Sequence, residues 1–406
     1  MSNAERILEG LDESQRRAAA AVDGPVLILA GAGSGKTRTI THRIAYASAV
    51  GAQRPDRALA VTFTAKAAGQ MRSRLASLGV GGVAVMTFHA AALRQLRHFW
   101  PQVVGGPTPR LATAKVPHVA QAAASLGLPR DRALLRDLAA EIEWAKVSRV
   151  RRDDYEATAA ARGRAAPGGL THREVGALYG AYADLLASEG LMDFEDVLVL
   201  TAGMLADRPD IADQVRQRYR WITVDEYQDV SAIQQALLQA WLGESDQLCV
   251  VGDPAQTIYP FAGASPDYLR SFRPWFPQAA TAPLERSYRC TPQIVGAANR
   301  LMGSERAGTT ASALRLTSEL PAGPQPEIRT CRDDVQEAEA IAERVLTWRD
   351  AGIPLREIAV LVRINAATAP VEEALSSAGI PYTVTGGERF FARAEVREAL
   401  LRLRGA

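Results

Sequence analysis

A glycine-rich stretch, AGAGSGKT at residues 30–37, carries the first residue types that could do chemistry. It directly follows an apolar run and opens a helical pattern, which is the context that a phosphate-binding loop requires. Glycines let backbone N–H groups turn toward phosphate oxygens, and the start of a helix adds partial positive charge. Lys36 is placed to reach the β- and γ-phosphates, and Thr37 to bring its hydroxyl to Mg²⁺. The strict pattern has glycine at position 30, where this chain has Ala30, so a glycine-rich turn with an exposed lysine is the alternative.

Two acidic residues follow another apolar run. Asp225 and Glu226 come directly after ITV at 222–224. An aspartate at the end of a strand can hold Mg²⁺, and a neighbouring glutamate can orient or deprotonate an attacking water. Such a pair can also simply cap a helix. Together with a phosphate-binding loop, it favours ATP hydrolysis with ATP and Mg²⁺ in the site.

A third stretch, GDPAQTIYPFAGA at 252–264, brings an amide and two aromatic rings close together in the chain. Gln256 follows an apolar run, and neighbouring strand ends in a doubly wound sheet meet at one crevice. We therefore expect Gln256 to sense the γ-phosphate or its attacking water. Tyr259 and Phe261 either pack in the core or stack on bases of a single strand, which contributes roughly 1–3 kcal/mol per base. In the second interpretation, this loop couples nucleotide state to the grip on the strand.

The bulk composition narrows the class of protein. A chain of 406 residues is expected to form two or three domains, and no stretch reaches the length of a membrane span. Three cysteines without metal-ligand spacing are typical of reduced cysteines in a cytoplasmic protein. The net charge of +2 neither demands nor excludes a nucleic-acid partner. The 47 basic residues include only four lysines, at positions 36, 66, 115 and 146, so a lysine in a glycine-rich loop stands out.

Short apolar runs, each followed by a helical pattern, predict an α/β fold with a doubly wound parallel sheet. The predicted strands lie at 26–31, 58–64, 83–89, 221–226 and 247–253. Between them, the region 93–204 has helical spacing and predicts a helical insertion. A second α/β unit is predicted from residue 284, with strands at 327–331 and 358–363 and helices at 336–352 and 371–379.

The motifs occur in an order that resembles the UvrD/Rep family of superfamily 1 DNA helicases over nearly the whole chain. LDESQRRAA (11–19) resembles the family's Q motif, and AGAGSGKTRT (30–39) resembles its phosphate-binding loop. VTFTAKAAGQMRSRL (61–75) and TFHAAALRQL (87–96) resemble motifs that contact single-stranded DNA. The later motifs correspond to VDEYQDV (224–230), VVGDPAQTIYPFAGA (250–264) and LERSYRCTPQIV (284–295).

This resemblance implies an architecture and a set of residue roles. It implies a first RecA-like motor domain at 1–92 and 205–283, the helical insertion at 93–204, and part of a second RecA-like domain at 284–406. It implies that Gln15 contacts adenine, that Tyr288 stacks near it, and that Arg289 acts as an arginine finger on the γ-phosphate.

The remaining implied roles fall into four groups. The implied catalytic residues are Lys36, Glu226, Gln256 and Arg289. The implied nucleotide-binding residues are Gln15, Ala30, Gly31, Ala32, Gly33, Ser34, Gly35, Lys36, Thr37, Arg38, Tyr288 and Arg289. Mg²⁺ is implied at Thr37 and Asp225. Single-stranded DNA is implied at Phe63, Thr64, Thr87, His89, Tyr259 and Phe261.

The chain also departs from the family pattern. The family usually has tryptophan and arginine where this chain has Phe261 and Ala262, and asparagine where it has Ala65. A smaller ring should stack less strongly, and loss of the arginine removes one route of coupling ATP to DNA. GGERFFARAEVREAL (386–400) resembles the point where the second motor domain gives way to its next insertion. The family's last two motifs are not found, so we expect an outlying member truncated before them.

The function implied by the resemblance is that of an ATP-dependent helicase or translocase on single-stranded DNA. Its expected partners are single strands and single-strand/duplex junctions, with 3′ to 5′ movement, and no membrane. Its expected setting is DNA repair or replication in the bacterial cytoplasm and nucleoid. Three alternatives stay open: a non-catalytic ATP- and DNA-binding fragment, a helicase-like subunit of a helicase–nuclease complex, and a small-molecule phosphotransferase. The last of these leaves the aromatic loop unexplained.

Overall fold

A computed structural model describes residues 2–258, 263–304 and 314–385. The chain forms two compact units, Met1–Gln325 and Pro326–Ala406. Within the described ranges, no helix is both long and apolar enough to cross a membrane. The three cysteines are free thiols.

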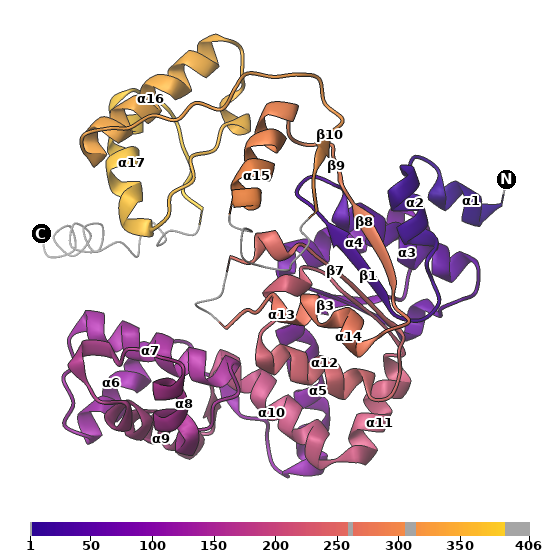
Figure 1. Cartoon of the computed structure of the whole chain (residues 1–406). Helices are drawn as coiled ribbons and strands as arrows, with labels where there is room; N and C mark the ends of the chain where they lie inside the picture. Colours follow the sequence, from indigo (N-terminus) through magenta and orange to yellow (C-terminus); the bar gives the residue numbers. More distant parts are fainter. Residues whose placement is uncertain (1, 259–262, 305–313, 386–406) are drawn as a thin grey trace, which may run out of the picture. The chain divides into compact units, whose positions relative to one another are not determined.

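The first unit is built on a six-stranded parallel sheet in the order β3-β2-β6-β7-β1-β8. Figure 1 labels four of these strands, β1, β3, β7 and β8. Its strands are β1 (Val26–Ala30), β2 (Ala58–Thr62), β3 (Ala84–Thr87), β6 (Trp221–Val224), β7 (Leu248–Gly252) and β8 (Ala280–Leu284). Every pair is parallel, with Leu27 opposite Val250 and Val61 opposite Val224. The predicted fold class, a doubly wound α/β sheet, is confirmed.

Helices cover both faces of this sheet because successive side chains of each strand point to opposite faces. In β1, Val26 and Ile28 pack in one apolar core and Leu27 packs in the other. The first core is completed by α2 (Glu13–Ala20), α3 (Lys36–Ala49) and α4 (Ala65–Ser77). The second is completed by α5 (Phe88–Val103), α10 (Phe194–Asp207), α11 (Pro209–Arg218), α12 (Ala232–Leu242), α13 (Asp267–Arg270) and α14 (Phe272–Trp275).

The helical insertion has an apolar core of its own. Its helices are α6 (Val116–Ser125), α7 (Arg132–Val147), α8 (Tyr155–Ala161) and α9 (His172–Ser188). Two short strands, β4 (Arg110–Leu111) and β5 (Leu191–Met192), pair where the sequence pattern gave no strand signal. Residues 93 and 204 lie inside α5 and α10, whose apolar side chains pack against the sheet.

The remaining elements of the first unit follow β8 or lie near the N-terminus. After β8 come β9 (Arg286–Ser287) and α15 (Pro292–Ser304), and β9 pairs with β10 (Thr317–Ser318). A short helix at the other end of the chain, α1 (Asn3–Leu8), begins with a capping box between Ser2 and Glu5.

The second unit contains the two predicted helices, α16 (Asp334–Asp350) and α17 (Thr368–Ser377), packed on a small apolar core. The two predicted strands, at 327–331 and 358–363, are wrong, because neither segment forms a strand. Their apolar side chains include Ile328 and Leu361, which are 98% and 92% exposed. A β-strand needs a hydrogen-bonded neighbour, and no described residue supplies one to either segment.

The largest fully buried side chain, Trp241, provides a test of this core. Its ring stacks on Phe88 with centroids 5.7 Å apart, and its Nε1–H donates to Gln95 Oε1 at 2.9 Å. We expect Trp241→Ala to lower the free energy of unfolding by about 3–5 kcal/mol, because it creates a cavity and leaves Gln95 unpaired. Urea denaturation followed by circular dichroism measures this loss. Trp275→Ala, at a site 44% exposed, is the matched control and should cost less than about 1 kcal/mol. Equal losses in the two variants would contradict the packing described here.

Candidate functional site

The phosphate-binding loop connects β1 to α3 through two glycines in the left-handed region. Gly33 has a φ of 76° and Gly35, the N-cap of α3, has a φ of 81°. A Cβ at Gly35 would lie 2.7 Å from Gln15 Nε2, and one at Gly33 would lie 2.7 Å from the Arg289 Cβ. The backbone angle and the close approach both require glycine. The loop therefore holds its N–H groups at a helix start, where anions bind.

A cavity of about 500 Å³ lies beside this loop. Its lining includes Asp12, Gln15, Arg38 and Tyr288, all predicted or adjacent to predicted nucleotide contacts. Gln15 is buried and its Nε2–H donates to the Ser34 carbonyl at 2.9 Å. The Tyr288 hydroxyl donates to Asp12, whose other side-chain oxygen caps α2. The cavity is thus bounded by an amide and an aromatic ring, the groups that can bond and stack on a planar base.

The tyrosine and arginine of this cavity are held by specific groups. Burial and the hydrogen bond to Asp12 raise the pKa of Tyr288 to about 12. The Tyr288 hydroxyl therefore stays protonated and keeps donating to Asp12 at neutral pH. Arg38 Nη2–H donates to the Gly10 carbonyl at 2.9 Å, which ties the start of α3 to the segment before α2.

Lys36 is ion-paired with Glu226. Its Nζ lies 2.9 Å from Glu226 Oε2, although the two residues are far apart in the sequence. Glu226 has a φ of 51°, which non-glycine residues rarely adopt and which is frequent at functional sites. The side-chain amide of Gln228 donates to the same Glu226 oxygen at 2.9 Å. Two donors thus fix the carboxylate of the predicted catalytic base.

Asp225 fits a divalent cation. Its carboxylate is buried and accepts a hydrogen bond from the Glu226 N–H at 3.0 Å. Burial and the neighbouring Glu226 carboxylate raise the pKa of Asp225 to about 7, with Lys36 acting in the opposite direction. A carboxylate in this environment gains from a nearby positive charge. Among the described residues, no group of three or more His, Cys, Asp or Glu could hold a metal, so Mg²⁺ would need phosphate and water ligands as well.

The loop after β7 is connected to Glu226 through a residue that the sequence analysis missed. Gln228 Oε1 accepts the Asp253 N–H at 3.1 Å, and Asp253 Oδ2 accepts from Gln256 Nε2 at 2.7 Å. A Cβ at Gly252 would lie 2.5 Å from Gln228 Oε1, so the strand end must be glycine. Gln228 is uncharged, and the only sequence signal for it was its place two residues after Glu226. A continuous path therefore runs from Lys36 to Gln256.

Arg289 lies against the phosphate-binding loop. Its Cβ limits the space at Gly33, as noted above, and the neighbouring Tyr288 N–H donates to the Gly33 carbonyl at 2.9 Å. Arg289 is an exposed residue and makes no ion pair with the residues that the structure describes. The geometry thus brings a positively charged side chain to the loop from the segment after β8.

Four of the residues predicted to contact DNA lie at the carboxyl ends of β2 and β3, which are neighbouring strands at one side of the sheet. Thr64 caps α4 by accepting the Ala67 N–H at 3.1 Å. Thr87 caps α5 in the same way, by accepting the Ala90 N–H at 3.2 Å. The Phe63 ring is 39% exposed. Both threonines therefore have a structural role that accounts for their presence without DNA.

His89 forms an aromatic pair that the sequence analysis did not predict. Its ring stacks on Phe194, with centroids 3.8 Å apart and planes 14° from parallel. Phe194 is 56% exposed, so one face of the pair is open to a ligand. The His89 Nε2 is buried and bonds to nothing within the described ranges, and burial lowers the pKa of His89 to about 4. No sequence pattern indicated Phe194, because it lies in the region assigned to the helical insertion.

Two predicted DNA contacts, Tyr259 and Phe261, lie outside the described residues, as do Ala262 and the segment 386–400. The loop resumes at Gly263, where a Cβ would lie 2.7 Å from Val147 Cγ2 at the end of α7. The N–H of Ser265 then donates to the Val230 carbonyl at 3.3 Å.

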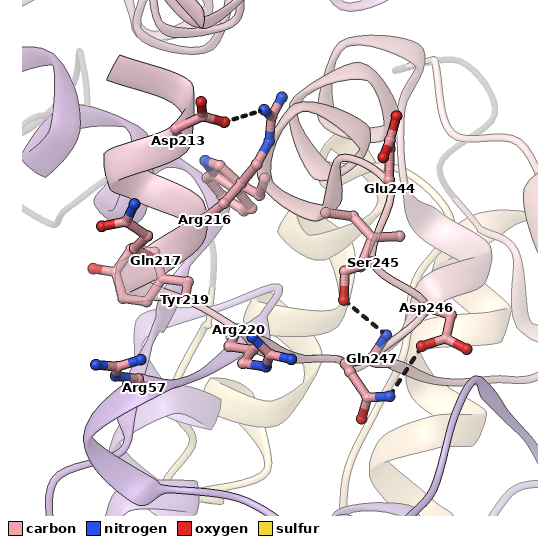
Figure 2. A pocket seen from close by; sticks show the side chains of 12 residues that line it. Arg57, Asp213, Arg216, Gln217, Tyr219, Arg220, Glu244, Ser245, Asp246 and Gln247 are labelled. Atoms are coloured by element: carbon pink, nitrogen blue, oxygen red, sulfur yellow. Dashed lines mark hydrogen bonds and ion pairs between the residues drawn. The ribbon is translucent and has the colours of Figure 1, made fainter. Parts of the chain in front are cut away.

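A second cavity, of about 460 Å³, lies at the amino-terminal ends of β2, β6 and β7, and Figure 2 shows the side chains that line it. Its residues Arg57, Arg220 and Gln247 each precede a strand, whereas the phosphate-binding loop follows one. Figure 2 shows that Arg216 pairs with Asp213, and that the Gln247 side chain bonds to its neighbour in the chain. Positive and negative charges balance around this cavity, and it takes no part in the site above.

These observations define a class. A phosphate-binding loop between β1 and α3, an acidic pair after β6 and a polar loop after β7 are the features of a P-loop nucleotide-binding domain. The family follows from comparison with known proteins. Residues 11–277 match the UvrD/REP helicase N-terminal domain, and residues 282–405 match the UvrD-like helicase C-terminal domain. The chain belongs to the UvrD/Rep helicase family.

Characterised relatives support the same assignment. The chain is 46% identical over 408 residues to the ATP-dependent DNA helicase UvrD2 of Mycobacterium tuberculosis, covering 98% of this chain and 58% of that protein. It is 34% identical over 411 residues to DNA helicase II of Escherichia coli, covering 98% of this chain and 54% of the relative. The UvrD1 helicase of M. tuberculosis is 34% identical over 425 residues, with 99% and 53% covered. The chain thus spans just over half the length of these relatives.

The His89 environment generates a pH prediction. In the unfolded chain a histidine takes up its proton near pH 6.5, whereas in the folded chain His89 does so near pH 4. The unfolded state therefore binds more protons between these values, and folding stability falls as the pH drops from about 6.5 to 4. We expect this residue to cost about 2 kcal/mol near pH 5. Urea denaturation of His89→Phe, which keeps an aromatic ring, should lose that part of the pH dependence. An unchanged pH dependence would contradict the assignment.

Proposed function

We propose that this chain contains the ATP-driven motor site of a DNA helicase that translocates along single-stranded DNA. The observation that supports it most is the path Lys36–Glu226–Gln228–Asp253–Gln256, which joins the ends of three sheet strands. It connects a phosphate-binding lysine to the loop that leads toward residues 259–261. A protein that only bound ATP would have no need for this path.

In this proposal the chemistry is hydrolysis of ATP. Gln15 and Tyr288 hold the adenine, and the loop from Ala30 to Lys36 holds the phosphates. Water attacks the γ-phosphorus, the bond to the bridging oxygen of ADP breaks, and Glu226 accepts a proton from the water. Phosphate oxygens compete with Glu226 for Lys36, which frees that carboxylate for the water. Arg289 stabilises the charge on the transferred group, a contribution worth about 10³–10⁵ in rate for arginine fingers.

Thr37 and Asp225 would hold Mg²⁺ in this proposal. The raised pKa of Asp225 indicates a carboxylate whose surroundings favour an added positive charge. When bound there, the ion would neutralise part of the negative charge of the phosphates. In this proposal Gln256, held by Asp253 on the loop after β7, responds when the Lys36–Glu226 pair separates.

The DNA part of the proposal concerns the residues at the carboxyl ends of β3, an outermost strand of the sheet, and its neighbour β2. Phe63, Thr64, Thr87 and the His89–Phe194 pair follow these neighbouring strands or lie against them. Exposed aromatic rings stack on bases without regard to sequence. Single-strand/duplex junctions, 3′ to 5′ movement, the domain limits set out above and a location in the cytoplasm on the nucleoid complete the proposal. The relatives' names as DNA helicases support only the part of the proposal that concerns action on DNA.

A binding module is the second candidate, because this chain spans 58% of its 46%-identical relative. The ATPase assay below separates the two candidates. A helicase-like subunit of a nuclease complex would give the same ATPase result as the first candidate, so nuclease activity on labelled DNA must be measured beside it.

Lys36→Ala tests the catalytic assignment. Loss of a preorganised charged donor typically costs about 10²–10³ in rate, so we expect steady-state ATP hydrolysis to fall by at least about 100-fold. The measurement is phosphate release with and without oligothymidylate, which should stimulate the unaltered chain. Near-normal turnover in the variant would refute the site. Absent turnover in the unaltered chain, with ATP and DNA binding retained, would favour the binding module.

Gln15→Ala tests the adenine contact separately from chemistry. Losing a hydrogen bond to the base should raise the KM for ATP about tenfold while changing kcat little, and should weaken the preference for ATP over GTP. The matched control is Gln247→Ala in the second cavity, which should change neither parameter. If Gln15→Ala lowers kcat and leaves KM unchanged, Gln15 acts by bracing the Ser34 carbonyl and not by reading the base.

A further inference from the structure

The segment 193–196 at the start of α10 carries three carboxylates around one exposed ring. Asp193, Glu195 and Asp196 flank Phe194, whose ring stacks on His89. Phe194 is more than half exposed, yet its two neighbours Asp193 and Glu195 are 3% and 6% exposed. The backbone that presents the ring is therefore fixed by buried groups on either side of it.

Two lysines hold these carboxylates. Lys146 Nζ, on α7, lies 2.8 Å from Asp193 Oδ2 and 2.7 Å from Asp196 Oδ1. Lys115, at the N-cap of α6, contacts Glu195 directly and lies 3.5 Å from Asp193 Oδ2. We call this group, with Tyr182, the lysine–carboxylate cluster.

The residues of the cluster also form the remaining side-chain hydrogen bonds of this turn. The Tyr182 hydroxyl, on α9, donates to Asp193 Oδ2 at 2.9 Å. Asp193 caps α10 by accepting the Asp196 N–H, and its own N–H donates back to Asp196 Oδ2 at 3.0 Å. Burial alone would raise the pKa of the Asp193 carboxyl, but Lys146 and Lys115 outweigh burial and hold it below its usual range. Asp193 is therefore ionised at the centre of the cluster.

The cluster connects two separate cores. Lys115, Lys146 and Tyr182 belong to the helices of the insertion core, while Val197 and Leu198 of α10 pack in the core against the sheet. The residue after Lys146 is Val147, and its Cγ2 fills the space beside Gly263 in the loop after β7. One turn of α7 thus contacts both the Phe194 segment and the loop that carries Gln256.

We propose that the lysine–carboxylate cluster positions the Phe194–His89 stack and thereby sets the affinity of this chain for single-stranded DNA. This inference rests on the proposed function. Lys146 and Asp193 are positioning residues in it, since they act through Phe194 and do not themselves touch a base. Each end of the segment is tied to the insertion core, so a base stacked on Phe194 meets a ring that is already ordered.

Lys146→Met tests the proposal, because it keeps a long side chain and removes the bridging charge. We expect the oligothymidylate concentration for half-maximal ATPase stimulation to rise about tenfold, which corresponds to the loss of one base stack. The maximal rate and the ATPase without DNA should stay within about twofold. A purely structural role would lower thermal stability without this separation.

The matched control is Arg164→Met in the same insertion core. Arg164 forms a comparable ion pair with the buried Glu141, reinforced by Tyr155, and it has no contact with 193–196 among the described residues. We expect this variant to lose thermal stability but to keep the half-saturating DNA concentration within about twofold. Equal increases in both variants would overturn the proposal.

A double-mutant cycle shows whether the lysine acts through the ring. Phe194→Ala should raise the half-saturating DNA concentration by itself, and adding Lys146→Met should raise it no further. Independent, multiplying effects would overturn the proposal. If Lys146→Met does not fold, the same cycle is run with Lys115→Met, which leaves the Lys146 bridge in place.

The outcomes also separate this inference from the proposed function. If the unaltered chain shows neither binding nor stimulation by oligothymidylate, both fail. If the unaltered chain is stimulated and Lys146→Met responds to the same DNA concentration, only the positioning role of the cluster fails.

Discussion

The parallel hydrogen-bonded ladder of the sheet is the constraint on which the rest of this structure depends. Because all six strands run in one direction, their carboxyl ends meet at one edge. Lys36 follows β1, Asp225 follows β6 and Gln256 follows β7, and these three strands are adjacent in the order β6-β7-β1. A one-residue slip in register would turn their side chains to the other face. The site is therefore a consequence of strand direction, and the two apolar cores that cover the sheet keep that direction fixed.

Backbone strain is concentrated at Glu226, just after β6. Glu226 holds a left-handed φ of 51°, a conformation that costs on the order of 1–3 kcal/mol at a non-glycine residue. Lys36 and Gln228 both donate to its carboxylate, and Asp225 is buried beside it. These contacts hold Glu226 in the strained conformation. Because Gln228 and Asp225 stay in place, the loss of the bond to Lys36 leaves the backbone of Glu226 unchanged. In the proposed mechanism a phosphate replaces Glu226 as the partner of Lys36, and Gln228 still connects Glu226 to Asp253 and so to the next loop.

The sequence was sufficient to predict five of the six strands of the sheet, but not β8, and the glycine-rich loop that joins β1 to α3. Apolar runs ending in polar residues predicted β1, β2, β3, β6 and β7, because a buried parallel strand is apolar on both faces. The glycines at 33 and 35 were predictable for a local reason, since a left-handed φ is a property of the residue itself. What failed depended on distant partners. The segments 327–331 and 358–363 have strand composition but no neighbour with which to pair, and composition contains no information on pairing.

Gln228, Phe194 and the lysine–carboxylate cluster were missed for the same physical reason. Each acts through a contact between residues far apart in the sequence, such as Lys146 with Asp193 and Gln228 with Asp253. A glutamine in the middle of an acidic motif or a phenylalanine before an acidic pair has no periodicity that marks it. The pairing of His89 with Phe194 appears only when α5 and α10 are packed together.

The choice of lysine in an arginine-rich chain is explained by these same contacts. Of its four lysines, Lys36, Lys115 and Lys146 are mostly buried and paired with carboxylates, and Lys66 is exposed. A guanidinium is a planar fork that matches one carboxylate in a bidentate arrangement, whereas an ammonium is a compact charge with three rotatable donors. Lys146 bonds to two carboxylates on one helical turn, a geometry that the compact group satisfies within a site only 4% exposed. In the proposed mechanism Lys36 has a related requirement, because it exchanges a carboxylate for phosphate oxygens without changing the loop around it. Lysine thus occurs where a compact, rotatable charge pairs with carboxylates inside the fold, while arginine supplies positive charge over most of the surface.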